Sequence, residues 1–192
     1  MLPLEFYQRK DVVQIAKDLI GTSLFTKMGN EPLTGGMIIE TEAYAGVNDR
    51  ASHAFGGKRT KRTETMYQTG GIAYVYLCYG MYPLLNVVTN EAEIPHAVLI
   101  RAIVPIEGIE TMQKRRKGKL PIANGPGMLT QALGIGMQHN AASFLTFSLW
   151  IEPRTIEIDE TLIEASKRIG VDYAKEDALL PWRFRLISRI AY

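Results

Sequence analysis

Two carboxylates in the segment Glu40-Thr41-Glu42-Ala43-Tyr44 are the first candidates for chemistry. Residues two apart in a strand point to the same face, so Glu40, Glu42 and Tyr44 would share one side. A solvated strand edge could carry these carboxylates without any function. The neighbouring residues favour the alternative, because Tyr44 and a long glycine-rich loop with His53 are typical of a pocket wall. The motif therefore predicts an acid or base near a strand end without defining a reaction.

A group of four tyrosines within nine residues is the second candidate: Tyr74, Tyr76, Tyr79 and Tyr82. Strand alternation puts Tyr74 and Tyr76 on one face, where core packing alone would explain their rings. Tyr79 precedes Gly80 at the predicted tip of a hairpin, where a large ring has little core to enter. An outward ring could wedge into a stack of nucleic-acid bases, and a ring on the sheet could stack a displaced base.

Three basic clusters stand out in a chain whose net charge is only +2. They are Lys58, Arg59, Lys61 and Arg62; Lys114, Arg115, Arg116, Lys117 and Lys119; and Arg183, Arg185 and Arg189. Most charge runs are solvated surfaces. Contact with an anionic backbone is the alternative, and it requires that folding bring several clusters to one face. The sequence alone leaves both interpretations open.

The sequence predicts strands and helices that must position these residues. Together they indicate an α+β fold. We expect a single compact domain over residues 1–192, with a curved, mainly antiparallel or mixed sheet, a protruding β-hairpin and surrounding helices. Apolar patterns predict strands over 36–43, 72–79, 84–89, 96–104, 145–151 and 184–188. Helices are expected over 12–20, with Asp11 as N-cap, over 106–116 after a turn at Pro105, over 125–133 and over 159–169.

Composition excludes several classes of protein. The apolar share of 46% and charged share of 22% are ordinary for a soluble globular domain. No apolar run reaches membrane-spanning length and no export signal is evident, so we expect a cytoplasmic monomer without a membrane partner. One cysteine and three scattered histidines give neither a disulfide nor zinc spacing, and we expect no metal. Phosphate-loop and GxGxxG motifs are missing, so no cofactor is expected.

Five segments together resemble the alkyladenine (3-methyladenine) DNA glycosylase family. They are ETEAYAG from Glu40, ASHAFGGKRTKR from Ala51, GIAYVYLCYGMYPLLNVV from Gly71, VLIRAIVPIEGIETM from Val98 and NGPGMLTQALGI from Asn124. The resemblance implies a monofunctional glycosylase of base excision repair that acts on double-stranded DNA. Such an enzyme flips alkylated or deaminated purines (3-methyladenine, 7-methylguanine, hypoxanthine) and hydrolyses the N-glycosidic bond with a Glu-activated water, leaving an abasic site.

The resemblance also implies roles for individual residues. These are Glu42 as general base, Arg101 as the arginine that helps to hold the water, Tyr44, His53 and Tyr76 around the flipped base, Asn86 as a screen for purine shape, and Tyr79 as the ring that fills the gap in the duplex. Met128 departs from the family, which often has a lysine there.

The chemistry of the substrate explains why one carboxylate could suffice. Glycoside hydrolysis ordinarily uses an acid and a base, but N3- or N7-alkylated purines are already cationic and can leave without protonation. A non-catalytic nucleic-acid-binding module is the main rival, and it would gain nothing from an anion such as Glu42 in its pocket. A formyl- or acyl-transferring enzyme is a second rival, and His53 has no obvious partners for that chemistry.

Overall fold

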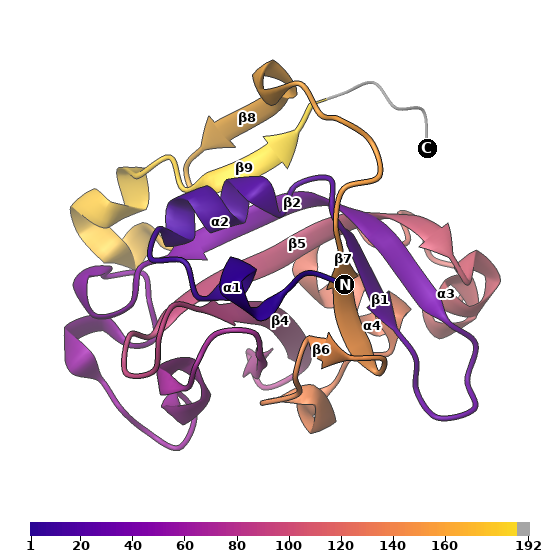
Figure 1. Cartoon of the computed structure of the whole chain (residues 1–192), viewed down its shortest axis with the longest axis horizontal. Coiled ribbons are helices and arrows are strands. Elements are labelled where there is room, and N and C mark those ends of the chain that lie inside the picture. Colours follow the sequence, from indigo (N-terminus) through magenta and orange to yellow (C-terminus); the bar gives the residue numbers. More distant parts are fainter. Residues whose placement is uncertain (188–192) are drawn as a thin grey trace.

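The computed structural model describes residues 1–187, and its largest element is a nine-stranded sheet with only antiparallel pairings (Figure 1). The strands are β1 (Ser23–Thr26), β2 (Thr34–Tyr44), β3 (Ala73–Cys78), β4 (Tyr82–Thr89), β5 (His96–Glu107), β6 (Leu145–Thr146), β7 (Leu149–Glu152), β8 (Ile163–Ser166) and β9 (Arg183–Leu186). Their order is β3-β4-β5-β2-β1-β7-β6, with β9 paired to β2 and β8 paired to β9.

Short helices surround this sheet. The α-helices are α1 (Leu4–Tyr7), α2 (Val12–Asp18), α3 (Ile109–Arg115) and α4 (Pro126–Leu133). Single 3-10 turns lie at Gly46–Asn48, Phe55–Gly57, Glu64–Tyr67, Met137–His139 and Glu160–Leu162, with a longer one at Asp172–Leu179. The α+β class and the curved antiparallel sheet are therefore confirmed.

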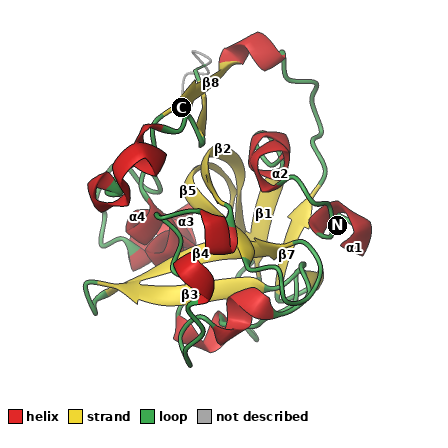
Figure 2. Cartoon of the chain, turned by 90° about the vertical axis from the view of Figure 1, so that its left-hand side faces the viewer, coloured by secondary structure: helices red, strands yellow, loops and turns green. Residues whose placement is uncertain are grey.

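The long strands β2 and β5 form the centre of the sheet and give it its curvature. β2 pairs with β1 along its first half and with β9 along its second half, while β5 follows its other edge. Register shifts between Ile38 and Thr41 interrupt the β2–β5 ladder, and such bulges increase local twist. Figure 2 shows the resulting curl and the β3–β4 hairpin extending beyond the neighbouring strands.

The main hydrophobic core lies between one face of the sheet and the helices α2, α3 and α4. Asp11 begins α2 by accepting hydrogen bonds at 3.0 Å from the backbone N–H groups of Val13 and Gln14, as predicted. Ile15 and Leu19 are fully buried, and a side chain of this size contributes about 1.5–3 kcal/mol. The helix thus covers this face of β2, while the opposite face remains available for a cavity.

Two sequence predictions about elements are wrong. Residues 159–169 do not form a helix: one 3-10 turn capped by Asp159 leads into β8. The edge of β9 accepts β8 as a partner, and this tertiary pairing overrides the local pattern. Pro105 also marks no turn, because β5 continues to Glu107 and the chain reverses at Gly108, which adopts the left-handed conformation at φ 66°.

The remaining boundaries differ by a few residues from those predicted. β2 runs to Tyr44, so Glu42 lies two residues inside the strand end. The last strand ends at Leu186, so Ile187 does not continue it as predicted, and Ser188 lies outside the described residues, as does Arg189 of the third basic cluster.

Candidate active site

The candidate site is built on one row of residues that crosses the sheet. Tyr74 on β3 pairs with Asn86 on β4, Asn86 with Leu99 on β5, Leu99 with Glu42 on β2, and Glu42 with Arg183 on β9. Directly opposed residues of antiparallel strands project to the same face. The register therefore brings together residues that are more than a hundred positions apart in the chain.

A β-bulge aims Arg101 at this row. Glu40 pairs with Ala102 and Thr41 with Ile100, so Arg101 is the extra residue of β5 and has no direct partner. An extra residue changes the direction of its side chain relative to the regular alternation. The Arg101 side chain lies between two carboxylates, with Nε 2.8 Å from Glu40 Oε1 and Nη1 3.3 Å from Glu42 Oε2.

Glu40 forms the other end of this charge network. Its Oε1 accepts hydrogen bonds from Arg101 Nε at 2.8 Å and from Arg183 Nε at 2.7 Å. Burial opposes ionisation of Glu40, but the hydrogen bonds and charges of the two arginines outweigh it and lower the pKa of this carboxyl. The alternating row Arg183, Glu40, Arg101 and Glu42 thus carries two positive and two negative charges.

Glu42 is fully buried directly behind the site surface. Its Oε1 accepts a hydrogen bond from the Ile169 backbone N–H at 2.8 Å, and its Oε2 accepts one from the Tyr44 hydroxyl at 2.8 Å. Burial and then the Glu42 charge raise the pKa of the Tyr44 phenol well above its ordinary value, so Tyr44 remains a donor. These donors fix the carboxylate in one orientation.

A buried ion pair supports Tyr44 from behind. Arg168 and Asp49 are both fully buried and joined by two hydrogen bonds, of 2.5 and 2.9 Å. The Arg168 guanidinium lies 4.9 Å from the centre of the Tyr44 ring and 5.1 Å from that of Trp182. Since Ile169 follows Arg168, this pair positions both the Tyr44 ring and the N–H that holds Glu42.

A cavity of about 400 Å³ opens above this arrangement. The predicted site residues that line it are Tyr44, His53, Tyr76, Tyr79, Asn86 and Arg101. Glu42 is not part of the wall, but its partners Tyr44, Arg101 and Ile169 all are. The fold thus gathers the seven predicted residues around one cavity, with the carboxylate immediately behind its surface.

His53 is held as a neutral imidazole. Its Nε2 lies 3.2 Å from Arg62 Nη2, and because a guanidinium only donates, Nε2 is the acceptor. Nδ1 lies 2.9 Å from the Tyr74 hydroxyl and carries the proton in this arrangement. Burial, followed by the charges of Arg62 and Lys58, lowers the pKa of His53 from its ordinary value of 6.5 to about 4.

The β3–β4 side of the cavity presents aromatic rings and one amide. Tyr74 and Tyr76 stack with their ring centres 5.5 Å apart, as their predicted common face requires. Asn86 is buried, and its Nδ2 donates to the Tyr74 carbonyl at 3.1 Å. Asn86 therefore has its Oδ1 as an acceptor and the second N–H of Nδ2 as a donor left for other partners.

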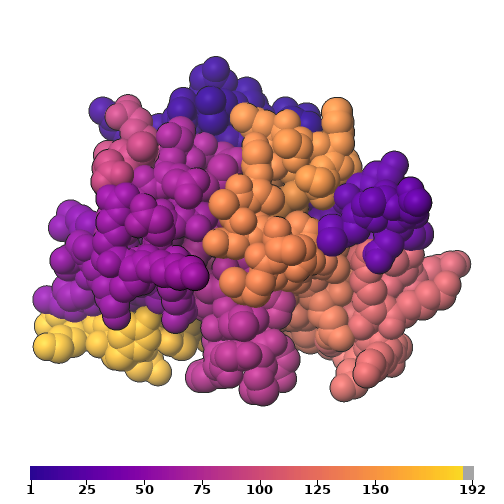
Figure 3. All heavy atoms as spheres, turned by 90° about the horizontal axis from the view of Figure 1, so that it is seen from below, coloured from indigo at the N-terminus to yellow at the C-terminus, as the bar shows by residue number. Residues whose placement is uncertain are grey.

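The hairpin tip projects away from the core, as predicted. Tyr79 is 89% exposed and adopts a left-handed conformation with φ 51°, and Met81 beside it is 66% exposed. Figure 3 shows this tip projecting from the rim of the molecule between the C-terminal segment (yellow) and the segment of α3 (salmon). Tyr79 also lines the cavity, so one ring lies at both the cavity mouth and the tip.

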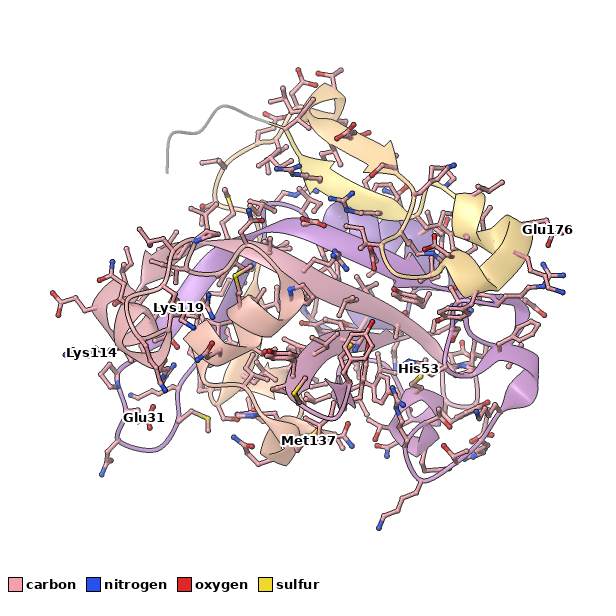
Figure 4. The ribbon with its side chains drawn as sticks, turned by 180° about the vertical axis from the view of Figure 1, so that it is seen from behind. Glu31, His53, Lys114, Lys119, Met137 and Glu176 are labelled. Carbon is pink, nitrogen blue, oxygen red and sulfur yellow. The ribbon has the colours of Figure 1, made fainter. Side chains whose placement is uncertain are left out.

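The second basic cluster lies apart from the end of the molecule that carries His53. Figure 4 places Lys114 and Lys119 at the end of the view opposite Glu176, with His53 on the Glu176 side. In the first cluster, Arg59 pairs with Glu64 at 2.7 Å and with Glu93 at 2.5 Å. Only part of the positive charge in the sequence therefore faces the cavity.

Sequence reasoning missed three contributors to the site. Arg168 and Ile169 lie far along the chain in a segment that was predicted to be helical, and no local pattern connects them to Glu42. Arg62 was assigned only to a basic cluster, although its guanidinium lies 4.8 Å from the centre of the Tyr76 ring. Its position nine residues after His53 was the available signal, because a compact loop can bring such neighbours together.

Within residues 1–187, no group of three or more His, Cys, Asp or Glu side chains could hold a metal ion. None of the helices in this range is long and apolar enough to cross a membrane.

Comparison with known proteins defines the class to which this chain belongs. Residues 5–189 match the family described as Methylpurine-DNA glycosylase. A protein of Chlamydia felis named as a 3-methyladenine DNA glycosylase is 46% identical over 97% of this chain and 96% of its own length. Proteins with the same name from Chlamydia pneumoniae and Clostridium novyi are 47% and 42% identical, over 97% and 94% of this chain and 95% and 92% of their own lengths.

The protein is therefore an enzyme of the DNA glycosylase class, a hydrolase of N-glycosyl bonds. The chain belongs to the methylpurine-DNA glycosylase family.

Proposed function

We propose that this enzyme flips an alkylated or deaminated purine out of double-stranded DNA and hydrolyses its N-glycosidic bond with a water activated by Glu42. The observation that carries the proposal is the Glu42–Arg101 pair behind a cavity walled by tyrosines. A binding module would gain nothing from a buried carboxylate at this point. A hydrolase needs one to accept a proton from water.

The water can be accommodated at Glu42 without breaking its support. A carboxylate offers about four lone-pair sites, and two hydrogen bonds occupy Glu42, from the Ile169 N–H and from the Tyr44 hydroxyl, while Arg101 lies 3.3 Å away as an ion-pair partner. Acceptor capacity therefore remains for a water that approaches between the residues of the cavity wall. Arg101 contacts the same carboxylate and is placed to hold that water against the sugar. The ionised carboxylate also stabilises the oxocarbenium character that develops there.

The leaving base determines how much further catalysis is needed. N3- and N7-alkylated purines such as 3-methyladenine and 7-methylguanine depart as neutral bases without protonation, since they are cationic in DNA. A cationic base between Tyr44 and Tyr76 gains about 0.5–2 kcal/mol of cation–π attraction per ring, and neutral bases gain less. Hypoxanthine lacks this advantage, so its release should be the slowest of the three.

The remaining cavity residues select and hold the base. Asn86, which lines the cavity, screens purines by shape with its Oδ1 and the remaining N–H of Nδ2. His53 contacts the base as a neutral imidazole, which adds no repulsion toward a cationic lesion.

Tyr79 is proposed to fill the gap that the flipped nucleotide leaves. Its exposed ring at the hairpin tip is positioned to wedge between the neighbouring bases, and unstacking a base costs a few kcal/mol. We further propose that residues 1–192 act as one glycosylase domain and as a monomer, because the cavity is complete within a single chain.

Single-turnover release of bases from duplex DNA tests this function. The wild-type enzyme, without added metal, is expected to free 3-methyladenine and 7-methylguanine, and hypoxanthine more slowly, leaving an intact strand with an abasic site. Undamaged adenine and guanine in the same duplex serve as the matched control. Tight binding without release of any base would contradict the proposal and favour a non-catalytic binding module.

A further inference from the structure

The outer edge of β3 is covered by an irregular segment, residues 140–144, and not by a further strand. β3 is the terminal strand of the sheet, so its backbone groups on this side need other partners. The Ala73 N–H donates to the Ala142 carbonyl, and the Ala141 N–H donates to the Ala73 carbonyl, both at 2.8 Å. The segment therefore follows β3 closely along its first residues.

Asn140 continues this edge with its side chain. Its Oδ1 accepts a hydrogen bond from the Val75 N–H at 3.0 Å, in the place that a backbone carbonyl of a neighbouring strand would take. Val75 lies between Tyr74 and Tyr76, which both line the base cavity. The bond therefore fixes the stretch of β3 that carries the two rings.

The same side chain reaches the adjoining wall of the cavity. This wall is formed by the connection between β2 and β3 that carries His53, here called the His53 loop (residues 45–72). Asn140 Nδ2 donates to the Thr65 hydroxyl oxygen at 3.0 Å, and Thr65 is buried in a 3-10 turn of this loop. Neighbouring residues of the turn pack with Tyr74 in one hydrophobic cluster. One amide thus links β3 to the His53 loop.

The two walls meet inside the cavity, where His53 contacts the tyrosines. The ring centres of His53 and Tyr76 are 4.6 Å apart with their planes at 83°, and His53 Nδ1 lies 2.9 Å from the Tyr74 hydroxyl. A base in the cavity must fit against both walls, so their relative position determines how the base aligns with Glu42. A displacement of about 1 Å between reacting groups can slow an enzyme about 100-fold.

The backbone next to Asn140 adopts an uncommon conformation. Ala141 has φ 66°, in the left-handed region that residues other than glycine rarely enter. Such a conformation persists where the surrounding structure holds it, and the hydrogen bond from the Ala141 N–H to β3 does so here. The turn that presents the Asn140 side chain is therefore fixed against the strand.

We propose that Asn140 is a positioning residue that sets the relative position of β3 and the His53 loop, the two walls of the base cavity. Asn140 does not line the cavity itself, so it acts through Val75 and Thr65. The inference rests on the proposed function, because the spacing of these walls controls how the flipped purine aligns with Glu42.

Two measurements test this role: single-turnover release of 7-methylguanine, and an NMR titration of His53 in the DNA-free enzyme. Asn140→Ala removes both hydrogen bonds, so release at saturating enzyme should slow about tenfold. The pKa of His53 is about 4 mainly because the ring is buried, and looser walls should let it rise toward its ordinary value of 6.5. A loss of global stability alone would not move this pKa in the folded protein. An unchanged rate or an unchanged His53 pKa overturns the proposal.

Asn140→Asp is the conservative variant. Its carboxylate accepts the hydrogen bond from the Val75 N–H, and the Thr65 hydroxyl can turn to donate to the second oxygen. Release should therefore stay within about threefold of wild type. Release as slow as that of Asn140→Ala would overturn the role of the two hydrogen bonds.

Thr65→Val separates the link between the walls from the support of β3 alone. It keeps the bond between Asn140 and Val75 but removes the acceptor of Asn140 Nδ2. Release should slow about threefold or more, and the double variant with Asn140→Ala should be no slower than Asn140→Ala alone. Effects that multiply in the double variant would overturn the link.

Ser143→Ala is the matched control, since the Ser143 hydroxyl accepts a hydrogen bond from the Leu145 N–H at 3.1 Å within the same segment. Release and the His53 pKa should not change, and slowing equal to that of Asn140→Ala would overturn a role specific to Asn140. Release by the wild type that Asn140→Ala leaves unchanged would reject this inference alone. A raised His53 pKa in Asn140→Ala, with a wild type that frees no base, would support the link between the walls and reject the proposed function.

Discussion

The buried pair of Asp49 and Arg168 allows one prediction to be worked out in detail. Asp49→Asn keeps the shape of the side chain but removes the charge that faces a fully buried guanidinium. Arg168 also donates to the Ala43 carbonyl at 2.8 Å and to the Asp177 carbonyl at 3.1 Å, but these neutral oxygens cannot replace the charge of Asp49, and Nε has no acceptor among the described residues. Asp49 also accepts hydrogen bonds from the backbone N–H groups of Ala45 at 3.1 Å and Ala51 at 2.9 Å.

The expected loss comes from breaking a buried ion pair on one side, which costs about 3–5 kcal/mol. An asparagine oxygen can retain part of the hydrogen bonding, so we expect a value near the lower end, about 3 kcal/mol. For a chain of this size, each kcal/mol lowers Tm by about 2–4 °C, which gives a fall of about 6–12 °C. Because Ile169 and Tyr44 depend on Arg168, single-turnover base release should also slow.

Thermal unfolding measured by circular dichroism is the assay, with Glu160→Gln as the control. Glu160 pairs with Lys17 at 2.7 Å but is 71% exposed, so its loss should cost less than about 1 kcal/mol. A Tm of Asp49→Asn within about 2 °C of wild type would refute this reasoning about the pair.

Three further predictions concern the site itself. Glu40→Gln removes the negative charge that orients Arg101, so single-turnover base release should fall about tenfold or more while lesion affinity changes little. An equal loss in both would contradict a positioning role. The pKa of His53 is about 4 in the folded protein and about 6.5 when unfolded, so between these values only the unfolded chain binds the proton. Stability therefore falls as pH drops from about 6.5 to about 4, less so in His53→Asn, and an NMR titration of His53 with a midpoint near 6.5 would contradict this assignment. Tyr79→Ala should weaken binding to lesion duplex about tenfold or more with little change in Tm, because the ring is 89% exposed; unchanged affinity would count against its role as a plug.

Much of the fold was predictable because its strands carry clear patterns. Alternation alone places Glu40, Glu42 and Tyr44 on one face, and the structure agrees through the Tyr44–Glu42 hydrogen bond. The hairpin tip at Tyr79 was predictable from the glycine and the flanking β-branched runs. The segment 159–169 failed because its short apolar pattern fits a helix as well as a strand, and only the free edge of β9 decides between them.

The site was less predictable than the fold, because its contacts depend on register. Arg101 contacts both Glu40 and Glu42 because of a β-bulge in the β2–β5 pairing. No local sequence pattern predicted this bulge. A run of basic residues in the sequence also does not show which side chains form ion pairs in the fold. Arg59 is paired with two glutamates, whereas its neighbour Lys58 has no carboxylate partner within residues 1–187. The roles of the seven site residues came from the family resemblance, and they stay predictions until variants are measured.

The measurement that tests the proposed mechanism most directly is single-turnover release of 7-methylguanine from duplex DNA by Glu42→Gln, beside wild type. The glutamine keeps the size of the side chain and a carbonyl oxygen for the Tyr44 hydroxyl, but it cannot take a proton from water. We expect lesion binding within a few-fold of wild type and base release slowed by about 100-fold or more. Release at the wild-type rate would contradict Glu42 as the base and remove the centre of the proposed mechanism.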